Sequence, residues 1–590
     1  MPTEIKSTAT DAAELNESVQ ATGYIPMVRT AFAEERYFLL LAIFIGVISG
    51  ALVVCFRLTI EWTSLELLGP VPAGIRLIIV PTVVSLLIAV LVMKVFPAVR
   101  GSGVNQTKAA LYIYNGYIPF RTAVGKFITA ALAIGSGHSL GPEDPSLQIG
   151  ASLASAIGRR LQLSREKLRL IAPVGAAAGL AAAFNAPISA VLFVIEEVIG
   201  RWSAGILGAV VLSAVSSVVV TRSILGSSPM FRIPPVESIR PFELLAYTIL
   251  GVVGGFASVI FSKAIAILRP RLKAAPRWTQ YLQPAIAGLL IGLIGYLGAP
   301  QVMGAGYNVI DRALHARFTW QFLAALAGLK ILSTTMSFVS GTPGGMFAPT
   351  LFIGAMLGGA VGGAEHVLFP HLTGSVATYA LVGMGVMFAG FLRAPMTAVF
   401  MVLEVSGNYS IIVPVILASG LSYLISRSLQ PVPVFDMLSR QDGLQLPSLE
   451  EEREAKVVRV EDAMRMPPVL VVEGEETVSE ALARTEKVPE TAFIVHLGMN
   501  SWASVTKEWL KQAVKDGKGD SVLQSVLPQT PMPRLYPDHQ LSAALPYLHE
   551  WPLLVVAHRA RPDQLEGILS LKDALRAYRD AGQEGGPPGE

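Results

Sequence analysis

Two stretches of this chain, about 204 residues apart, carry the same short motifs in the same order. This internal repeat is the strongest constraint on the fold, because two similar halves that lie in a membrane usually enclose a binding site at their interface. Four pairs of segments correspond: Gly101-Ser102-Gly103-Val104-Asn105 with Gly304-Ala305-Gly306-Tyr307-Asn308, Lys126 with Lys330, Gly141 through Ala151 with Gly345 through Ala355, and Ala186 through Glu196 with Ala394 through Glu404. The motifs alone leave open whether the halves are parallel or inverted.

The residues around these motifs are unusually apolar. The chain is 52% hydrophobic and only 15% charged, whereas soluble domains carry about 25% charged residues. A bilayer is spanned by roughly 20 apolar residues, and five runs reach that length, at about 37–57, 75–97, 203–221, 244–268 and 282–298. Five others are short or are broken by Gly and Pro, at 121–135, 146–158, 187–199, 349–362 and 395–406. Broken segments at membrane depth are tolerated only beside protein or water, so the pattern predicts an all-α polytopic membrane domain with a transport path.

Charge divides the chain into three parts. Residues 1–36 are polar and lack the features of a signal peptide, which predicts a cytoplasmic N-terminal segment. Residues 37–440 form the predicted membrane domain, with repeat halves at about 75–221 and 282–426, and residues 441–590 form a predicted soluble domain. The basic loop Gly158–Leu170 predicts that both termini are cytoplasmic and that the protein is an integral, multi-pass protein of the inner or plasma membrane.

Three glycine-rich segments precede helical apolar runs: Gly101-Ser102-Gly103, Gly141-Pro142-Glu143 and Gly344-Gly345-Met346-Phe347. The first turn of a helix has unpaired N–H groups and a partial positive charge, so three such turns can hold an anion without a fixed cation. Weak binding of this kind suits transport, because the ion must also leave. The alternative is that these glycines only let helices pack closely.

The two halves differ in chemistry at three positions: Ser102 against Ala305, Glu143 against Phe347, and Glu197 against Val405. A carboxylate at a helix start can occupy an anion site and leave it when protonated, and an acid within a membrane is a functional candidate. The alternatives are that Glu143 only caps its helix and that Glu197 is a solvated helix end.

Other acids and bases recur in both halves and are therefore predicted to be structural. Glu196 and its counterpart Glu404 are predicted to accept hydrogen bonds from backbone N–H groups. Lys126 and Lys330 are predicted to give electrostatic support or to extend toward the membrane surface.

Taken together, these motifs resemble those of the CLC family of chloride channels and chloride/proton antiporters. Gly101-Ser102-Gly103-Val104-Asn105 is similar to that family's GSGIP motif, Gly141-Pro142-Glu143-Asp144-Pro145 to GREGP, and Gly344 through Pro349 to GGxFxP. The resemblance covers roughly residues 35–440. It implies an inverted repeat and a homodimer with one pore per subunit, lying in the lipid bilayer.

The resemblance also assigns roles to residues. Ser102 and Gly103, with the amides of Met346 and Phe347, are implied to bind chloride. Glu143 is implied to be the gating glutamate on the external side, and Glu197 the internal proton-transfer glutamate, which favours proton-coupled antiport over a passive chloride channel of the same fold.

Two departures from the family pattern bear on this assignment. Phe435 stands where the family usually has a tyrosine ligand, so central binding would be weaker and coupling looser. Pro142 and Asp144 replace the usual Arg and Gly, and Asp144 adds a second acid beside Glu143.

The predicted soluble domain contains two units in which short apolar runs alternate with helical stretches, an α/β pattern. The first opens at Val460 and the second at Pro533. The pattern resembles a tandem pair of CBS domains, which implies that Ser570 and Asp573 can contact an adenine nucleotide. The alternative is a dimerising module without a ligand.

Other classes of protein fit the sequence poorly. The net charge of +3 is too small to suggest nucleic acid as a partner. The apolar runs contain no HExxH or GxSxG arrangement, so we expect no enzyme activity in the membrane domain. We also expect no metal site and no cofactor there. The ions that the resemblance implies as transported are chloride and protons. A divalent-cation transporter would need clustered acids facing the path.

Overall fold

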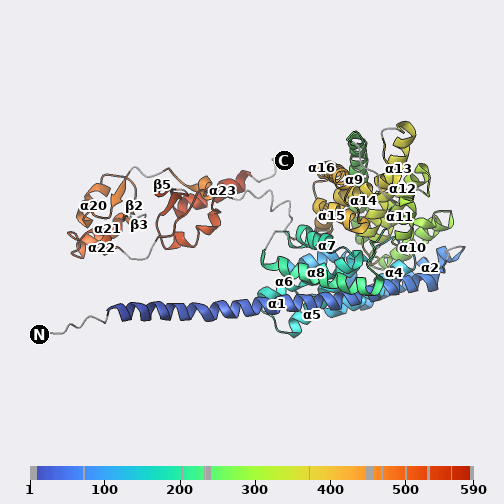
Figure 1. Cartoon of the computed structure of the whole chain (residues 1–590), viewed down its shortest axis with the longest axis horizontal. Coiled ribbons are helices and arrows are strands. Elements are labelled where there is room, and N and C mark those ends of the chain that lie inside the picture. Colours follow the sequence, from blue (N-terminus) through green and yellow to red (C-terminus); the bar gives the residue numbers. More distant parts are fainter. Residues whose placement is uncertain are drawn as a thin grey trace. The chain divides into compact units, whose positions relative to one another are not determined.

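The computed structural model describes residues 9–70, 74–200, 204–231, 233, 241–315, 317–370, 373–444, 446, 458–466, 470–498, 501–527, 532–559 and 561–584. The chain divides into two compact units, Met1–Leu449 and Glu450–Glu590 (Figure 1).

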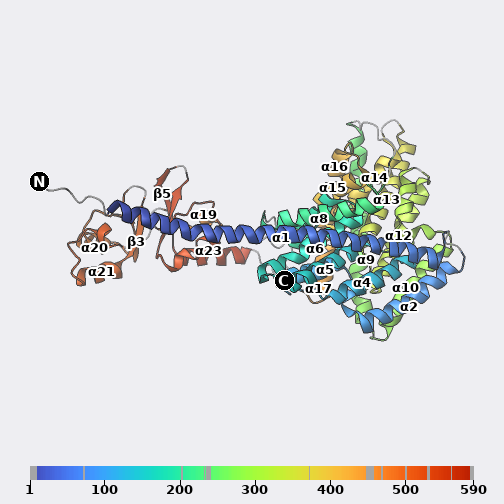
Figure 2. The ribbon, with the colours of Figure 1, turned by 60° about the horizontal axis from the view of Figure 1, so that its bottom comes forward.

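Helices dominate the first unit, and they fall into two similar series. The first series contains α1 (Ala9–Leu68), α2 (Arg76–Val90, continued as a π-helical turn to Val95), α3 (Gly103–Tyr112), α4 (Phe120–Gly135), α5 (Glu143–Arg160), α6 (Arg165–Phe184), α7 (Pro187–Phe193, continued as a π-helical turn to Ile199) and α8 (Ala204–Leu225). The second contains α9 (Glu243–Ala274), α10 (Thr279–Tyr296), α11 (Tyr307–Leu314), α12 (Trp320–Val339), α13 (Phe347–Leu368), α14 (Val376–Leu392), α15 (Pro395–Ser406), α16 (Ile412–Leu429) and α17 (Val434–Gln441). Figure 2 shows these helices from a second direction, with the two series in blue to green and in green to orange.

Eight helices of the described residues are long and apolar enough to cross a membrane. They include four of the five predicted spans, in α1, α2, α8 and α9. The fifth predicted span, about 282–298, is α10, an 18-residue helix that is not among the eight. The segment 349–362 was predicted to be broken, and this is wrong: α13 runs unbroken for 22 residues and is largely buried, because its glycines let neighbouring helices approach.

Close contacts between glycines join the helices in pairs, α5 with α6 and α13 with α14. A Cβ atom at Gly150 would lie 2.2 Å from the carbonyl oxygen of Gly175. The equivalent Cβ atom at Gly354 would lie 2.3 Å from the carbonyl oxygen of Gly383. Both halves therefore use the small-residue packing that is common between membrane helices.

The two equivalent lysines each donate hydrogen bonds to backbone carbonyls of the loop before a helix in their own half. Lys126 donates to the carbonyls of Val99 (3.0 Å) and Gly101 (2.6 Å). Lys330 makes the same contacts with Val302 (2.9 Å) and Gly304 (2.7 Å). Both lysines are fully buried, so the prediction that they support the structure is confirmed and the prediction that they reach the membrane surface is wrong.

Glu196 and Glu404 act across the two halves. Glu196 accepts from the backbone N–H groups of Met396 (3.1 Å) and Thr397 (2.8 Å), at the start of α15. Glu404 accepts from those of Ile188 (2.9 Å) and Ser189 (2.7 Å), at the start of α7. The predicted role of these two acids as structural acceptors is confirmed.

The second unit is a soluble α/β domain with two hydrophobic cores. One core is formed by a three-stranded sheet and three helices. The strands lie in the order β1-β2-β3 (Val471–Glu473, Ala492–His496, Trp502–Thr506), with β1 parallel and β3 antiparallel to β2. The helices are α20 (Val478–Thr485), α21 (Lys507–Lys515) and α22 (Leu523–Val526). The other contains the antiparallel pair β4 (Leu554–His558) and β5 (Arg561–Leu569), with α19 (Val460–Ala463) and α23 (Leu571–Glu584). Val460 and Ala463 were predicted to open the first unit, but α19 packs against α23 in the second, because its two apolar residues are buried there.

The glycine contact between α5 and α6 leads to a stability prediction. Gly150→Ala forces these helices apart, and overpacking of this kind costs about 1–3 kcal/mol. We expect the purified variant to have a lower melting temperature than the parent protein. Gly420→Ala in α16 is the control, because no atom of a neighbouring helix lies within 4 Å of the added Cβ atom. Equal melting temperatures for the two variants would contradict the packing argument.

Candidate functional site

The starts of α5 and α13 meet through a pair of backbone hydrogen bonds. The Gly141 N–H donates to the Gly345 carbonyl at 2.8 Å, and the Gly345 N–H donates to the Gly141 carbonyl at 2.8 Å. These glycines occupy equivalent positions in the repeat, so each half contributes the same donor and the same acceptor to this contact. The positively polarised starts of two helices from different halves are thereby held side by side.

The start of α3 completes this arrangement, which we call the cradle. Ser102 caps α3, and its hydroxyl accepts from the Val104 N–H at 3.2 Å. The same hydroxyl lies 3.5 Å from a carboxylate oxygen of Asp144, the second residue of α5. Three helix starts, from Ser102, Glu143 and Met346 onward, therefore converge as the sequence predicts.

Glu143 is fully buried, and its carboxylate accepts hydrogen bonds from two residues of the opposite half. Its Oε2 accepts from the Ala348 N–H of α13 at 3.3 Å, and its Oε1 accepts from the hydroxyl of Tyr307 in α11. The N-cap of α5 is Pro142. The reading of Glu143 as a cap of its own helix does not fit these contacts, which instead put a carboxylate on the start of another helix.

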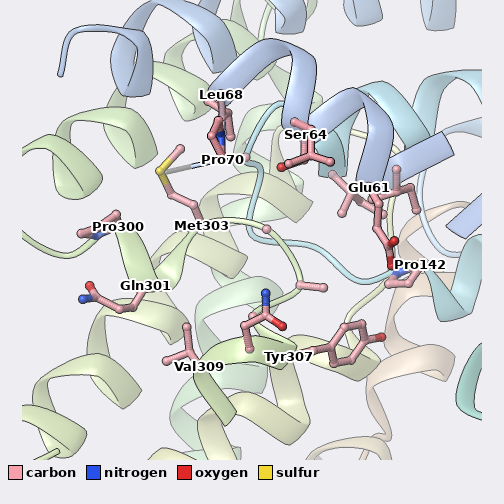
Figure 3. A pocket seen from close by; sticks show the side chains of 18 of the residues that line it. Glu61, Ser64, Leu68, Pro70, Pro142, Pro300, Gln301, Met303, Tyr307 and Val309 are labelled. Atoms are coloured by element: carbon pink, nitrogen blue, oxygen red, sulfur yellow. The ribbon is translucent and has the colours of Figure 1, made fainter. Parts of the chain in front are cut away.

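A cavity of about 790 Å³ opens beside this carboxylate. Pro142 and Tyr307 are among the residues that line it, and Figure 3 shows both side chains together with Glu61. Arg57 and Arg312 also line the cavity, and Arg57 interacts electrostatically with Glu143. Cationic side chains in a cleft raise the local concentration of anions.

The remaining predicted ligands lie in the same place. Met346 donates its N–H to Asp144 Oδ2 at 3.2 Å, and Phe347 is the first residue of α13. A Cβ atom at Gly103 would lie 2.5 Å from the Asp144 carbonyl oxygen, so this glycine lets α3 reach α5. The structure thus brings the four predicted ligands close to the carboxyl groups of Glu143 and Asp144. These ligands are Ser102, Gly103, Met346 and Phe347.

Phe435 belongs to a buried aromatic cluster beside the cradle. Its ring centroid lies 6.3 Å from those of Phe193 and Phe347, and Phe347 also contacts Phe193 at 4.9 Å and Phe388 at 5.6 Å. The Phe435 carbonyl accepts from the side chain of Asn105 at 3.0 Å, which fixes α17 against α3. Phe435 offers a ring and no hydroxyl.

Glu197 lies in a separate buried ion cluster. Lys108 of α3 contacts Glu197 at 3.3 Å and Asp436 of α17 at 2.9 Å, and all three side chains are buried. The reading of Glu197 as a solvated helix end therefore does not hold. Asp436 follows Phe435 directly, so the cluster is connected through α17 to the aromatic residues at the cradle.

Three residues of these networks escaped the sequence analysis: Tyr307, Lys108 and Asp436. Tyr307 could have been found, because it is a polar residue where the other half has Val104. Lys108 and Asp436 carried a weaker signal, which was the presence of charges within the membrane domain close to the anion motif and to Phe435.

The two candidate nucleotide ligands lie at the start of α23. Asp573 Oδ2 accepts from the Ser570 hydroxyl at 2.5 Å, from the Ser570 N–H at 3.1 Å and from Arg465 at 2.9 Å. Ser570 Oγ in turn accepts from the Asp573 N–H at 3.3 Å. These contacts form a reciprocal helix cap. Among the described residues, no group of three or more His, Cys, Asp or Glu side chains is placed to hold a metal ion.

Comparison with known proteins identifies the family. Residues 84–427 match the family described as voltage gated chloride channel. The chain belongs to this family, the CLC proteins. It is 32% identical over 377 residues to a putative chloride channel protein ClcB-like of Ralstonia nicotianae, covering 63% of this chain and 87% of that protein. It is 30% identical over 415 residues to the H(+)/Cl(-) exchange transporter ClcA of Vibrio campbellii, covering 68% of this chain and 88% of that protein.

Solved CLC structures share the fold. A slow cyanobacterial Cl-/H+ antiporter matches with a TM-score of 0.64 and 25% identity, covering 70% of this chain and 99% of that chain. A eukaryotic CLC transporter matches with a TM-score of 0.60 and 19% identity, covering 91% of this chain and 97% of that chain. The predicted fold class, an all-α membrane domain with an internal repeat followed by a soluble α/β domain, is confirmed.

The buried ion cluster leads to a second stability prediction. Lys108→Met leaves the carboxyl groups of Glu197 and Asp436 buried without their cation, and the loss of one partner from a buried pair costs about 3–5 kcal/mol. We expect a large drop in the melting temperature of the purified protein. Lys263→Met, at an exposed position on α9, is the control. If both variants melt at the same temperature, the cluster does not stabilise the fold.

Proposed function

We propose that this chain is an antiporter that exchanges chloride for protons across a membrane. The observation that carries the proposal is the buried Glu143 carboxyl group on the Ala348 amide, beside the cavity. An anion and this carboxylate require the same helix-start amides, so protonation of the acid and binding of the anion are linked. Relatives that carry the name exchange transporter support the same reading.

The residues of the cradle have distinct roles in this proposal. Ser102 and the amides of Met346 and Phe347 bind the anion, and Gly103 lets α3 approach them. Glu143 is the gate: ionised, it fills the anion position, and protonated, it can leave. The Tyr307 hydroxyl and the Ala348 amide hold it in the closed position.

Glu197 is proposed to pass protons between the cytoplasm and Glu143. Its burial beside Lys108 and Asp436 supports this role, because an acid without access to bulk water exchanges protons only through neighbouring groups. The aromatic cluster around Phe347, with rings from α7, α13, α14 and α17, is proposed to keep the region beside the cradle apolar.

A passive chloride channel of the same fold is the second candidate. The observation that favours it is Phe435, whose ring offers no hydroxyl to a chloride ion. Weaker binding of the anion would loosen the competition with Glu143 and allow chloride to pass without a proton.

The assembly and the soluble domain complete the proposal. We propose a homodimer with one pore per subunit, in the inner or plasma membrane, with both termini and the C-terminal domain in the cytoplasm and Glu143 facing the external side. The C-terminal domain is proposed to be a CBS-like pair. Because Ser570 and Asp573 cap each other, the contacts favour a structural role for them, and adenine nucleotide binding remains a prediction from the sequence.

Flux measurements on reconstituted protein test the function. In liposomes with a chloride gradient and no proton gradient, we expect chloride to flow down its gradient and to drive protons in the opposite direction. Chloride flux with proton movement at the level of empty liposomes would select the channel. Absence of chloride flux would contradict both candidates.

Glu143→Gln is the variant that connects this flux to the cradle. The amide side chain cannot exchange a proton, so we expect chloride flux to persist and proton flux to fall to background. Glu61→Gln is the matched control, because Glu61 is an acid that lines the same cavity and, in the part of the chain that the structure describes, makes no hydrogen bond to a helix start. Normal coupling in Glu143→Gln would remove Glu143 from the mechanism.

A further inference from the structure

A second carboxyl group lies in the cradle, and the proposed function gives it no task. The Asp144 side chain is fully buried. Its Oδ2 accepts from the Met346 N–H at 3.2 Å and from the Ser102 hydroxyl at 3.5 Å. These two donors are among those assigned above to the anion, so Asp144 occupies a position that the anion needs.

The backbone around Asp144 is shaped to admit this side chain. A Cβ atom at Gly345 would lie 2.8 Å from the Asp144 Cβ atom. On the opposite side, a Cβ atom at Gly103 would lie 2.5 Å from the Asp144 carbonyl oxygen. The absence of side chains at these two glycines therefore lets two other helix starts approach Asp144 closely.

Buried polar atoms near Asp144 lack partners among the described residues. They are Asp144 Oδ1 and both amide atoms of Gln148, which lies one turn later in α5. The Gln148 Oε1 atom lies 3.3 Å from the position of a Cβ atom on Gly103. Buried polar atoms without partners are costly, and a bound anion would supply an acceptor for the Gln148 amide group.

Two charged groups act on Asp144, one in its own helix and one in the neighbouring helix α4. Glu143 precedes it in α5, and Lys126 of α4 interacts with it electrostatically while donating to the Gly101 carbonyl at 2.6 Å. The two acids take different amides of one helix start, Met346 for Asp144 and Ala348 for Glu143. The cradle thus contains two adjacent anion positions, each filled by a carboxyl group of the protein.

We propose that Asp144 is a second gate, which closes the inner anion position as Glu143 closes the outer one. This inference rests on the proposed chloride transport and adds a second acid that controls the same site. Chloride enters the inner position when the Asp144 side chain is protonated or has turned away. The equivalent residue in the other half of the repeat is Ala348, so only one half supplies this gate.

Chloride binding to the full-length protein in detergent tests the inference directly. Asp144→Ala removes the competing group, and Asp144→Asn keeps its shape without the charge. Since like charges repel strongly in a buried site, we expect chloride to bind at least about tenfold more tightly to Asp144→Ala than to the parent protein, measured by calorimetry, with a smaller gain for Asp144→Asn. Asp311→Asn, which removes an exposed charge from α11, should bind chloride as the parent does. Unchanged affinity in both Asp144 variants would overturn the proposal.

Flux in liposomes separates this inference from the proposed function. In Glu143→Gln, we expect chloride flux to rise as the pH falls, because Asp144 still closes the inner position when ionised. In Glu143→Gln/Asp144→Asn, flux should be high at every pH. Identical pH profiles for the two variants would overturn the second gate while leaving chloride transport intact. A parent protein that moves no chloride would instead overturn the proposed function itself.

Discussion

The two hydrogen bonds between Gly141 and Gly345 are the interaction on which the rest of this structure depends. They hold the starts of α5 and α13, which belong to different halves of the repeat, at backbone contact distance. Only residues without side chains permit this approach. The result is a set of polarised amides that point into one buried region, where an anion is stabilised without a fixed cation.

The repeat supplies the scaffold, and the differences between its halves supply the chemistry. The scaffold is symmetric: Lys126 and Lys330 hold equivalent loops, and Glu196 and Glu404 cap helices of the opposite half. The cradle is asymmetric, because Glu143, Asp144 and Ser102 have Phe347, Ala348 and Ala305 as their counterparts. A symmetric frame can therefore carry a site in which one half supplies the acids and the other half supplies apolar side chains at the equivalent positions.

The sequence predicted the membrane domain, the repeat and the convergence of three helix starts, because each of these depends on local motifs that occur twice. It predicted the roles of Glu196 and Glu404 for the same reason. It did not predict that α13 is continuous or that α19 packs with the second core of the soluble domain, since both depend on contacts with segments distant in sequence. Lys108, the partner of Glu197, was missed because a pairwise contact leaves no trace in one sequence unless the repeat exposes it. Tyr307, the partner of Glu143, was missed although the repeat does expose it, as a polar residue opposite Val104.

Helix-start amides, rather than arginine or lysine side chains, form the proposed anion site. The most direct test is anomalous X-ray diffraction from bromide-soaked crystals of Glu143→Ala, in which the outer position is vacant. We expect a bromide peak at hydrogen-bonding distance from the Ala348 amide at the start of α13. Bromide found only beside Arg57 and Arg312 in the cavity, with none at the helix start, would contradict the account.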